Sequence, residues 1–202
     1  MALGFVSVCS MLLAQDVPVV DRGTTELAGF VGGSYGIDQF RAMGGGNVGY
    51  SVTRNLMPYG EFTYFPGVGR YAQGPTLPSI GTVQYEYPVR LADIHVGVHY
   101  RIPLGEHNKF VPYVAAGVGV IHTFTVNNLV ASVTLSDGQT ISSGPINDAA
   151  KSEAAGNFGG GFRIYFDQKF GMRIEAKAYK AQDERVFGKV TVGFFYQIRP
   201  KI

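Results

Sequence analysis

Apolar and polar residues alternate without a break from residue 90 to residue 102. One parity holds Ala92, Ile94, Val96, Val98, Tyr100 and Ile102, and the other holds Asp93, His95, Gly97, His99 and Arg101. Because successive side chains of a strand point to opposite faces, this segment predicts a strand with one apolar and one polar face. The same pattern recurs along the chain, with aromatic residues near the ends of the segments.

Seven further segments have this alternation: residues 26–35, 47–53, 59–65, 111–125, 157–166, 170–180 and 186–199. Eight strands are an even number and form the smallest barrel that spans an outer membrane. The pattern therefore predicts an all-β fold: an eight-stranded antiparallel transmembrane β-barrel with up-and-down meander order. The apolar parity would face lipid and the polar parity would face the lumen.

The connections between these segments alternate in length. Residues 54–57, 103–109 and 167–169 form short links, whereas residues 66–89 and 126–156 form long ones. Outer-membrane barrels have short periplasmic turns and longer extracellular loops, which would put both termini on the periplasmic side.

The two long connections differ in their expected structure. The first contains four prolines, Pro66, Pro75, Pro78 and Pro88, and is expected to lack regular pairing. The second has residues 130–135 and 139–142 flanking a Ser-Asp-Gly turn signal, so we expect a two-stranded hairpin that rises above the bilayer.

Composition agrees with a single barrel domain, assigned to residues 24–202. Of 202 residues, 46% are apolar and 16% are charged, yet no long apolar run follows the N-terminus, which argues against helical membrane spans. The 28 glycines, 12 tyrosines and 14 phenylalanines fit bending strands and aromatic residues at the water boundary. A net charge of +2 gives no reason to expect a nucleic-acid partner.

Residues 1–14 are expected to be a signal peptide, because residues 3–14 form an apolar segment of the length of a secretory core. No Lys or Arg precedes this segment, so either the start codon is assigned too late or the leader is truncated; a buried N-terminal helix is the alternative. The only cysteine, Cys9, lies in the leader, and an exported protein that lacks it would need no disulfide.

The polar parity of the strands collects charged and imidazole side chains of both signs. They are Glu61, Asp93, His95, His99, Arg101, Arg163, Arg173, Glu175, Lys177 and Lys189. Because unpaired charges in a narrow lumen would be costly, we expect a fixed salt-bridge network that closes the barrel. A gated channel or small porin is the alternative. Counting outward from the turn at residues 167–169 puts Arg163 opposite Arg173, with Glu175 as their expected counter-charge.

Metal binding and catalysis are weaker interpretations. His95 and His99 lie four residues apart on a strand, roughly 13 Å, too far to share a metal bound at about 2 Å. No metal or other cofactor is therefore expected. His122 lies where a lipid A deacylase would place its histidine, but the position two residues along holds Phe124 instead of a serine. We expect no enzymatic activity.

A soluble, lipocalin-like barrel is another alternative. It would reverse the two faces and place the charged side chains outside. The glycine-rich inner positions and the leader favour the membrane form.

Residues 112–120, Pro-Tyr-Val-Ala-Ala-Gly-Val-Gly-Val, together with residues 157–166, resemble the small outer-membrane barrels that include the OmpA barrel domain and the opacity-type proteins. The resemblance implies an eight-stranded barrel with variable surface loops, a plugged lumen and structural, adhesive or host-contact roles. We therefore expect an integral outer-membrane protein of a Gram-negative-type bacterium, with a structural or surface-interaction role. Its expected partners are outer-membrane lipid, the barrel-assembly machinery with its periplasmic chaperones, and an unidentified extracellular ligand. It is expected to be a monomer.

Overall fold

The computed structural model describes residues 20–36, 40–77, 81–104, 109–135, 138–182 and 186–199, and within them all regular structure is β. Eight strands form a closed barrel: β1 (Thr25–Tyr35), β2 (Arg41–Tyr50), β3 (Leu56–Leu77), β4 (Gly81–Arg101), β5 (Phe110–Thr123), β10 (Lys151–Tyr165), β11 (Phe170–Ala181) and β12 (Val186–Ile198). The leader expected over residues 1–14 lies outside the described residues. No helix in the described part of the chain is long and apolar enough to cross a membrane.

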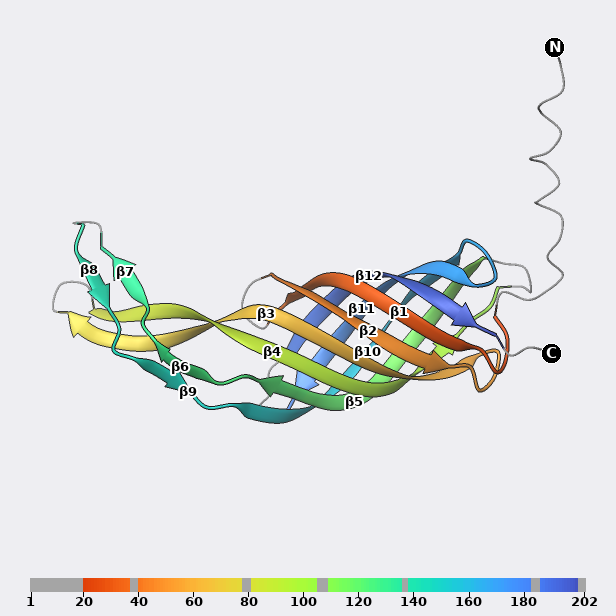
Figure 1. Cartoon of the computed structure of the whole chain (residues 1–202), viewed down its shortest axis with the longest axis horizontal. Coiled ribbons are helices and arrows are strands. Elements are labelled where there is room, and N and C mark those ends of the chain that lie inside the picture. The colour runs from red at the N-terminus through yellow and green to blue at the C-terminus, as the bar shows by residue number, and fades with distance from the viewer. Residues whose placement is uncertain are drawn as a thin grey trace, which may run out of the picture.

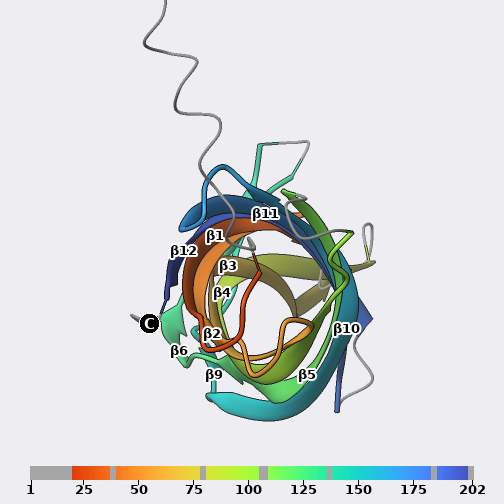
Figure 2. The same cartoon turned by 90° about the vertical axis from the view of Figure 1, so that its right-hand side faces the viewer.

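Each barrel strand pairs antiparallel with its sequence neighbour in the barrel, and β1 closes the ring by pairing with β12 from Thr25↔Ile198 to Tyr35↔Gly188. The ring is visible along the barrel axis (Figure 2). The predicted eight-stranded antiparallel meander is confirmed. Closure leaves no unpaired strand edge in the barrel wall, which a membrane-spanning sheet requires.

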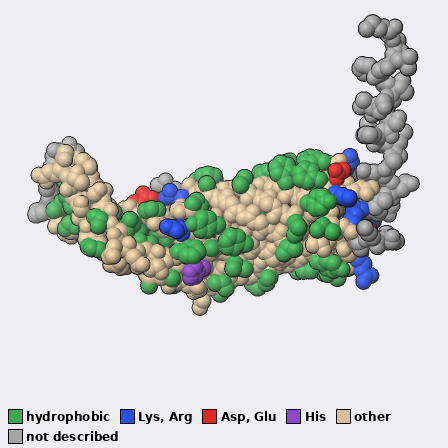
Figure 3. Space-filling view, in the orientation of Figure 1, with side chains coloured by type: hydrophobic (Ala, Val, Ile, Leu, Met, Phe, Trp, Pro, Cys, Tyr) green, Lys and Arg blue, Asp and Glu red, His purple; other side chains and the backbone are tan. Residues whose placement is uncertain are grey.

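The two faces of the wall are as predicted. Outward residues such as Val31, Val118 and Val190 are 58–69% exposed, whereas inward residues of the same strands are buried. Figure 3 shows hydrophobic side chains spread over the outer wall. Ala92 is an exception: it has the outward parity but is only 7% exposed, since it is small and lies between Tyr64 and His122 in the register.

Exposed aromatic side chains surround the barrel near its ends. At the end with the short turns they are Tyr50, Tyr100, Phe110, Phe166, Phe170 and Tyr196, and at the other end Tyr35, Phe40 and Phe124. Tyrosine and phenylalanine side chains at the two ends of the barrel wall fit the two interfaces between a bilayer and water.

The short turns and both ends of the described chain lie at the same end of the barrel (Figure 1). Side chains fix two of these turns: the Asp167 carboxylate accepts hydrogen bonds from the backbone N–H groups of Lys169 and Phe170 at 2.6 and 2.7 Å. The Thr53 hydroxyl accepts from the N–H groups of Asn55 and Leu56 at 3.2 and 2.9 Å. Asp and Thr favour turns because they form such local bonds.

The second strand is shifted from its predicted bounds of residues 47–53. It begins at Arg41 and ends at Tyr50, and residues 44–46, all glycine, are paired with β1. Glycine is depleted from strands because it has no side chain to pack, which is why the pattern missed this half. In the closed wall, pairing to β1 on one side and to β3 from Gly44 onward on the other stabilises the segment.

The first long connection is also different from the expectation. Instead of lacking regular pairing, β3 and β4 continue as a hairpin to Leu77↔Gly81, with register shifts between Phe65 and Val68 and between Gln73 and Thr76. Proline is tolerated at bulges and in strands with an unpaired edge. Beyond the barrel, no other described strand pairs with β3 or β4. Val83, Tyr85 and Tyr87 alternate with exposed residues, which is typical of a strand, but the nearby prolines argued against one.

The second long connection forms the predicted hairpin. β7 (Ser132–Thr134) pairs with β8 (Thr140–Ser142), and below them β6 (Val126–Leu129) pairs with β9 (Ile146–Asp148). Both long hairpins extend from the same end of the barrel, opposite the short turns (Figure 1).

Candidate functional site: the barrel lumen

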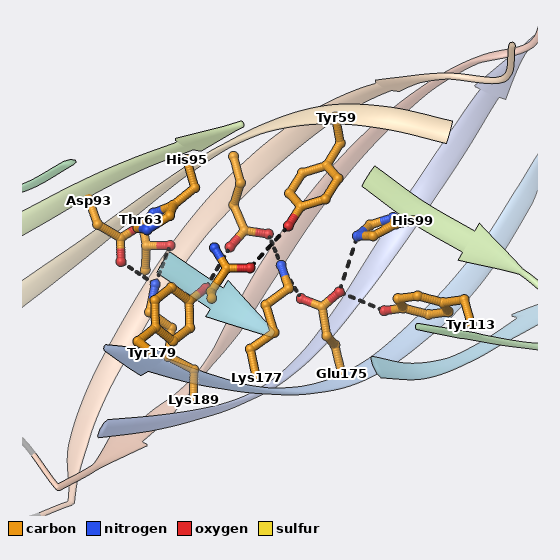
Figure 4. A network of polar contacts seen from close by, with 12 residues as sticks. Tyr59, Thr63, Asp93, His95, His99, Tyr113, Glu175, Lys177, Tyr179 and Lys189 are labelled. Atoms are coloured by element: carbon orange, nitrogen blue, oxygen red, sulfur yellow. Dashed lines mark hydrogen bonds and ion pairs between the residues drawn. The ribbon is translucent and has the colours of Figure 1, made fainter. Parts of the chain in front are cut away.

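All ten residues predicted for the lumen point inward, and none is more than 5% exposed. They come from five strands: Glu61 from β3, Asp93, His95, His99 and Arg101 from β4, Arg163 from β10, Arg173, Glu175 and Lys177 from β11, and Lys189 from β12. Their alternation with outward residues is what directs them to one interior. Figure 4 shows how side chains from opposite walls meet there.

The first cluster lies nearest the long hairpins. Lys189 forms an ion pair with Asp93, which comes from the opposite wall, and its ammonium also donates to the Thr63 hydroxyl at 3.2 Å. The ammonium lies 4.2 Å from the centre of the Tyr179 ring, a cation–π contact. His95 lies beside the same carboxylate, with Nδ1 3.6 Å from Asp93 Oδ1.

The second cluster fills the middle of the lumen. The Lys177 ammonium lies between two carboxylates, 2.9 Å from Glu61 and 2.8 Å from Glu175. Tyr113 donates its hydroxyl to Glu175 over 2.7 Å, and Tyr179 donates to Glu61 over 3.3 Å. These contacts join β3, β5 and β11. The Lys177–Glu61 ion pair crosses the lumen, whereas the Lys177–Glu175 pair lies along β11.

The third cluster lies toward the short turns and differs from the prediction. Arg163 is opposite Arg173, as expected. Its ion-pair partner, however, is Glu26 on β1, and its other nitrogen, Nη2, lies 2.9 Å from His99 Nδ1. Glu175 directly contacts Lys177, Tyr113 and His99. It is also the acidic group with the strongest favourable electrostatic effect on Arg173, so the expected counter-charge holds for Arg173 and not for Arg163.

Glu26 is the residue that sequence reasoning missed. It begins the predicted strand at residues 26–35 and has the opposite parity to the outward Val31, so the signal was present. Glu26 on β1 comes within reach of Arg163 on β10 only when β1 pairs with β12 and closes the barrel.

The two remaining arginines bind to uncharged groups. Arg101 donates to the backbone carbonyl of Thr53 over 3.1 Å. With the Asn47 amide turned to present its oxygen, Arg173 Nη2 donates to it over 2.7 Å, and the guanidinium lies 5.6 Å from the centre of the Phe30 ring.

Glycines on the inner wall make room for these side chains. A Cβ at Gly119 would lie 2.7 Å from Cγ of His95 and 2.1 Å from the Ile94 carbonyl oxygen. Only glycine fits beside the buried imidazole at that position.

Two apolar layers enclose the polar clusters along the barrel axis. Toward the long hairpins lie Met43, Phe65, Val68, Leu91, Ile121, Ala155, Tyr179, Ala181 and Phe187. Toward the short turns lie Val20, Val111, Tyr165 and Phe195, with Ala28 against them. Burial between such layers lowers the local dielectric constant and strengthens each ion pair.

The described residues hold no group of three or more His, Cys, Asp or Glu side chains arranged to bind a metal ion. His122 points outward, and its Nδ1 lies 2.9 Å from the hydroxyl of Ser152 on the neighbouring strand. The sequence comparison considered only a serine on the same strand as His122. It therefore did not predict a pair with Ser152 on the neighbouring strand. The ring also makes an edge contact with Phe124, 4.9 Å between centres.

The fold is that of known small outer-membrane barrels. The N-terminal barrel domain of Pseudomonas aeruginosa OprF has a TM-score of 0.53 and 16% identity, covering 88% of this chain and 98% of that one. Neisserial surface protein A has a TM-score of 0.56 and 12% identity, covering 87% and 97%. The attachment invasion locus protein Ail of Yersinia pestis has a TM-score of 0.52 and 15% identity, covering 88% and 99%.

No curated protein matches the sequence. The family model described as outer membrane protein beta-barrel domain matches residues 2–197. The expected location in the outer membrane of a Gram-negative-type bacterium is confirmed, and the long hairpins are accordingly extracellular and the short turns periplasmic. The chain belongs to the outer membrane protein β-barrel domain family.

Proposed function

We propose that this outer-membrane protein acts at the cell surface through its two long extracellular hairpins, and that its barrel anchors them without conducting. The observation that carries the proposal is a polar clasp between the hairpins. The Asp148 carboxylate, at the end of β9, accepts from Arg70 of β3 at 3.1 Å and from the Tyr87 hydroxyl of β4 at 3.4 Å. Arg70 also reaches the Thr123 hydroxyl at 3.4 Å, which ties the clasp to the barrel wall.

The clasp makes the two hairpins one platform. Recognition surfaces are commonly carried by loops on a rigid scaffold, and strand pairing together with the clasp lowers the entropy that these hairpins would lose on binding. Another ion pair at this end, Arg41 with Glu86 at 2.8 Å, joins β2 to the first hairpin.

The edges of the hairpins suit a protein partner. Beyond the barrel, the pairs β6–β9 and β7–β8 are two-stranded sheets, and a two-stranded sheet has unpaired groups along both edges. Between residues 126 and 150, the described residues carry a single charge, Asp148. Charged residues are what usually protect such edges, so an extended segment of another protein is the partner that these edges favour.

The proposal is tested on whole cells that display the protein. Deletion of residues 132–142 should abolish adhesion to immobilised serum and matrix proteins, while the heat-modified gel shift of the barrel persists. Lys169→Ala, in a periplasmic turn, is the control and should leave adhesion unchanged. Adhesion that is the same with and without the hairpin would refute the surface role.

The closed lumen is tested separately. Ion pairs that cross the lumen between two apolar layers leave little room for water, so we expect planar bilayers to show small or intermittent currents. Steady, large single-channel currents from the wild type would replace this proposal with the small-porin alternative.

Catalysis is not part of the proposed function. Nucleophilic activation of a serine by histidine needs a third group that orients the imidazole ring. Among the described residues, the contacts of the His122 ring are with the Ser152 hydroxyl and the phenyl group of Phe124, and neither is such a group.

A further inference from the structure

The strand β7, near the tip of the second extracellular hairpin, has one side that pairs with no described strand. β7 pairs with β8 from Ser132↔Ser142 to Thr134↔Thr140, and these two strands form a sheet of their own. The hairpin lies at the extracellular end of the molecule, far from the periplasmic turns (Figure 1). The open edge of β7 therefore lies on the side of the molecule that faces a neighbouring cell.

The hydrogen-bond pattern of the hairpin determines which backbone groups point to that edge. The Leu135 N–H donates to the Gln139 carbonyl at 2.8 Å, so these two residues form a bonded pair next to the turn. Bonded and non-bonded pairs alternate along an antiparallel ladder. The backbone N–H and C=O groups of Ser132 and Thr134 therefore point away from β8, toward the open edge.

The sequence around β7 favours pairing with a further strand. Residues 129–135, Leu-Val-Ala-Ser-Val-Thr-Leu, contain no charge, no proline and no glycine. Segments of this length and composition associate readily when they are exposed on an edge. Ser132 and Thr134 are exposed, and Val130 is 57% exposed. Native proteins often protect an edge strand with a lysine, a proline or a bulge, and β7 has none of these.

We propose that β7 pairs edge to edge with β7 of a second copy on a facing cell, so that the protein joins cells that carry it. This inference rests on the proposed surface role of the hairpins and names one partner for them. Two facing cell surfaces are related by a two-fold axis that lies parallel to both, and this axis reverses the direction of β7. The strand is then antiparallel to its copy, whereas two copies in one membrane would present it in parallel, which is the slightly less stable pairing.

The register of the pair follows from the backbone groups at the edge. When Val133 lies opposite Val133 of the second copy, Ser132 lies opposite Thr134 of the second copy, and the reverse holds on the other side of the axis. The N–H and C=O groups that point away from β8 then meet and form two bonded pairs. Because no side chain in residues 129–135 is charged, two identical edges meet without like-charge repulsion. One strand of this length binds weakly, and many copies on each cell supply the avidity.

Charge exchange at Ser132 tests the pairing on cells that display the protein and whose lipopolysaccharide lacks O-antigen. In the proposed register Ser132 lies diagonally across from Ser132 of the second copy, within reach of long side chains. Wild-type cells should aggregate and settle, whereas cells without the protein stay dispersed. Ser132→Lys cells and Ser132→Glu cells should each stay dispersed, but a mixture of the two should aggregate, and high salt should disperse that mixture. A foreign protein on the edge of β7 would not produce this rescue.

Ser142→Lys is the matched control, because Ser142 lies opposite Ser132 in the hairpin and its backbone groups point to the other edge, that of β8. It should aggregate like the wild type, and all variants should keep the heat-modified gel shift of the barrel. The proposal is overturned if wild-type cells stay dispersed, if the Lys and Glu mixture stays dispersed, or if Ser142→Lys also abolishes aggregation.

Adhesion of the same wild-type cells to immobilised serum and matrix proteins separates this inference from the proposed function. Adhesion without aggregation refutes the pairing between copies alone. Absence of both adhesion and aggregation refutes the surface role of the hairpins as well.

Discussion

Glu26→Gln is expected to destabilise the barrel more than any change to a surface ion pair. The substitution keeps the shape of the side chain and removes only its charge. Arg163, which is fully buried, would then lose the one ion-pair partner that it has among the described residues, and its charge would remain inside the lumen.

The magnitude follows from the surroundings of Arg163. Removing one partner of a buried ion pair typically costs about 3 to 5 kcal/mol. The guanidinium keeps contacts with the rings of Tyr113 and Phe195, 5.0 and 5.6 Å away, and these cation–π interactions offset part of the loss. We therefore expect the lower limit, about 3 kcal/mol, on the order of a 100-fold change in the unfolding equilibrium constant.

Urea unfolding in lipid vesicles, followed by gel migration without boiling, measures this change. The control is Glu86→Gln, which removes the partner of Arg41 in an exposed pair and should cost less than about 1 kcal/mol. Arg163→Met added to Glu26→Gln should recover part of the stability, because the unpaired charge is then gone. The reasoning is refuted if Glu26→Gln and Glu86→Gln cost the same, or if the second substitution makes the protein less stable.

Three more outcomes are expected. Val96→Arg, on the outer face near the middle of β4, should cost about 2 to 4 kcal/mol in the same unfolding assay, whereas Gln84→Arg in the extracellular part of that strand should change stability little; the reverse ranking would mean that the faces are inverted. Asp148→Asn should increase protease cleavage of the extracellular hairpins while the barrel stays intact, and unchanged cleavage would argue against the clasp. Ser152→Ala should leave the lipid A of expressing cells with the same acylation in mass spectra; a difference from the wild type would revive the enzyme alternative.

The alternation along each segment determined which side chains face lipid and which face the lumen. His95 and Val96 are consecutive residues and end on opposite sides of the wall, because the strand geometry itself has a period of two. The number of strands followed from counting such segments, and the hairpin of β7 and β8 followed from the turn chemistry of residues 136–138. Alternation and turn chemistry are local properties, so each can be recognised within a single segment of the sequence.

Which charged side chains pair inside the lumen was decided by closure of the barrel. Glu26 is 137 residues from Arg163 in sequence, and no local pattern relates them until β1 pairs with β12 and faces β10 across the ring. The same is true of Lys189 with Asp93 and of Arg70 with Asp148. The prolines of the first long connection were misleading for a related reason. The sequence shows that proline has no backbone N–H to donate, but only the tertiary structure decides whether that position faces a neighbouring strand or an open edge.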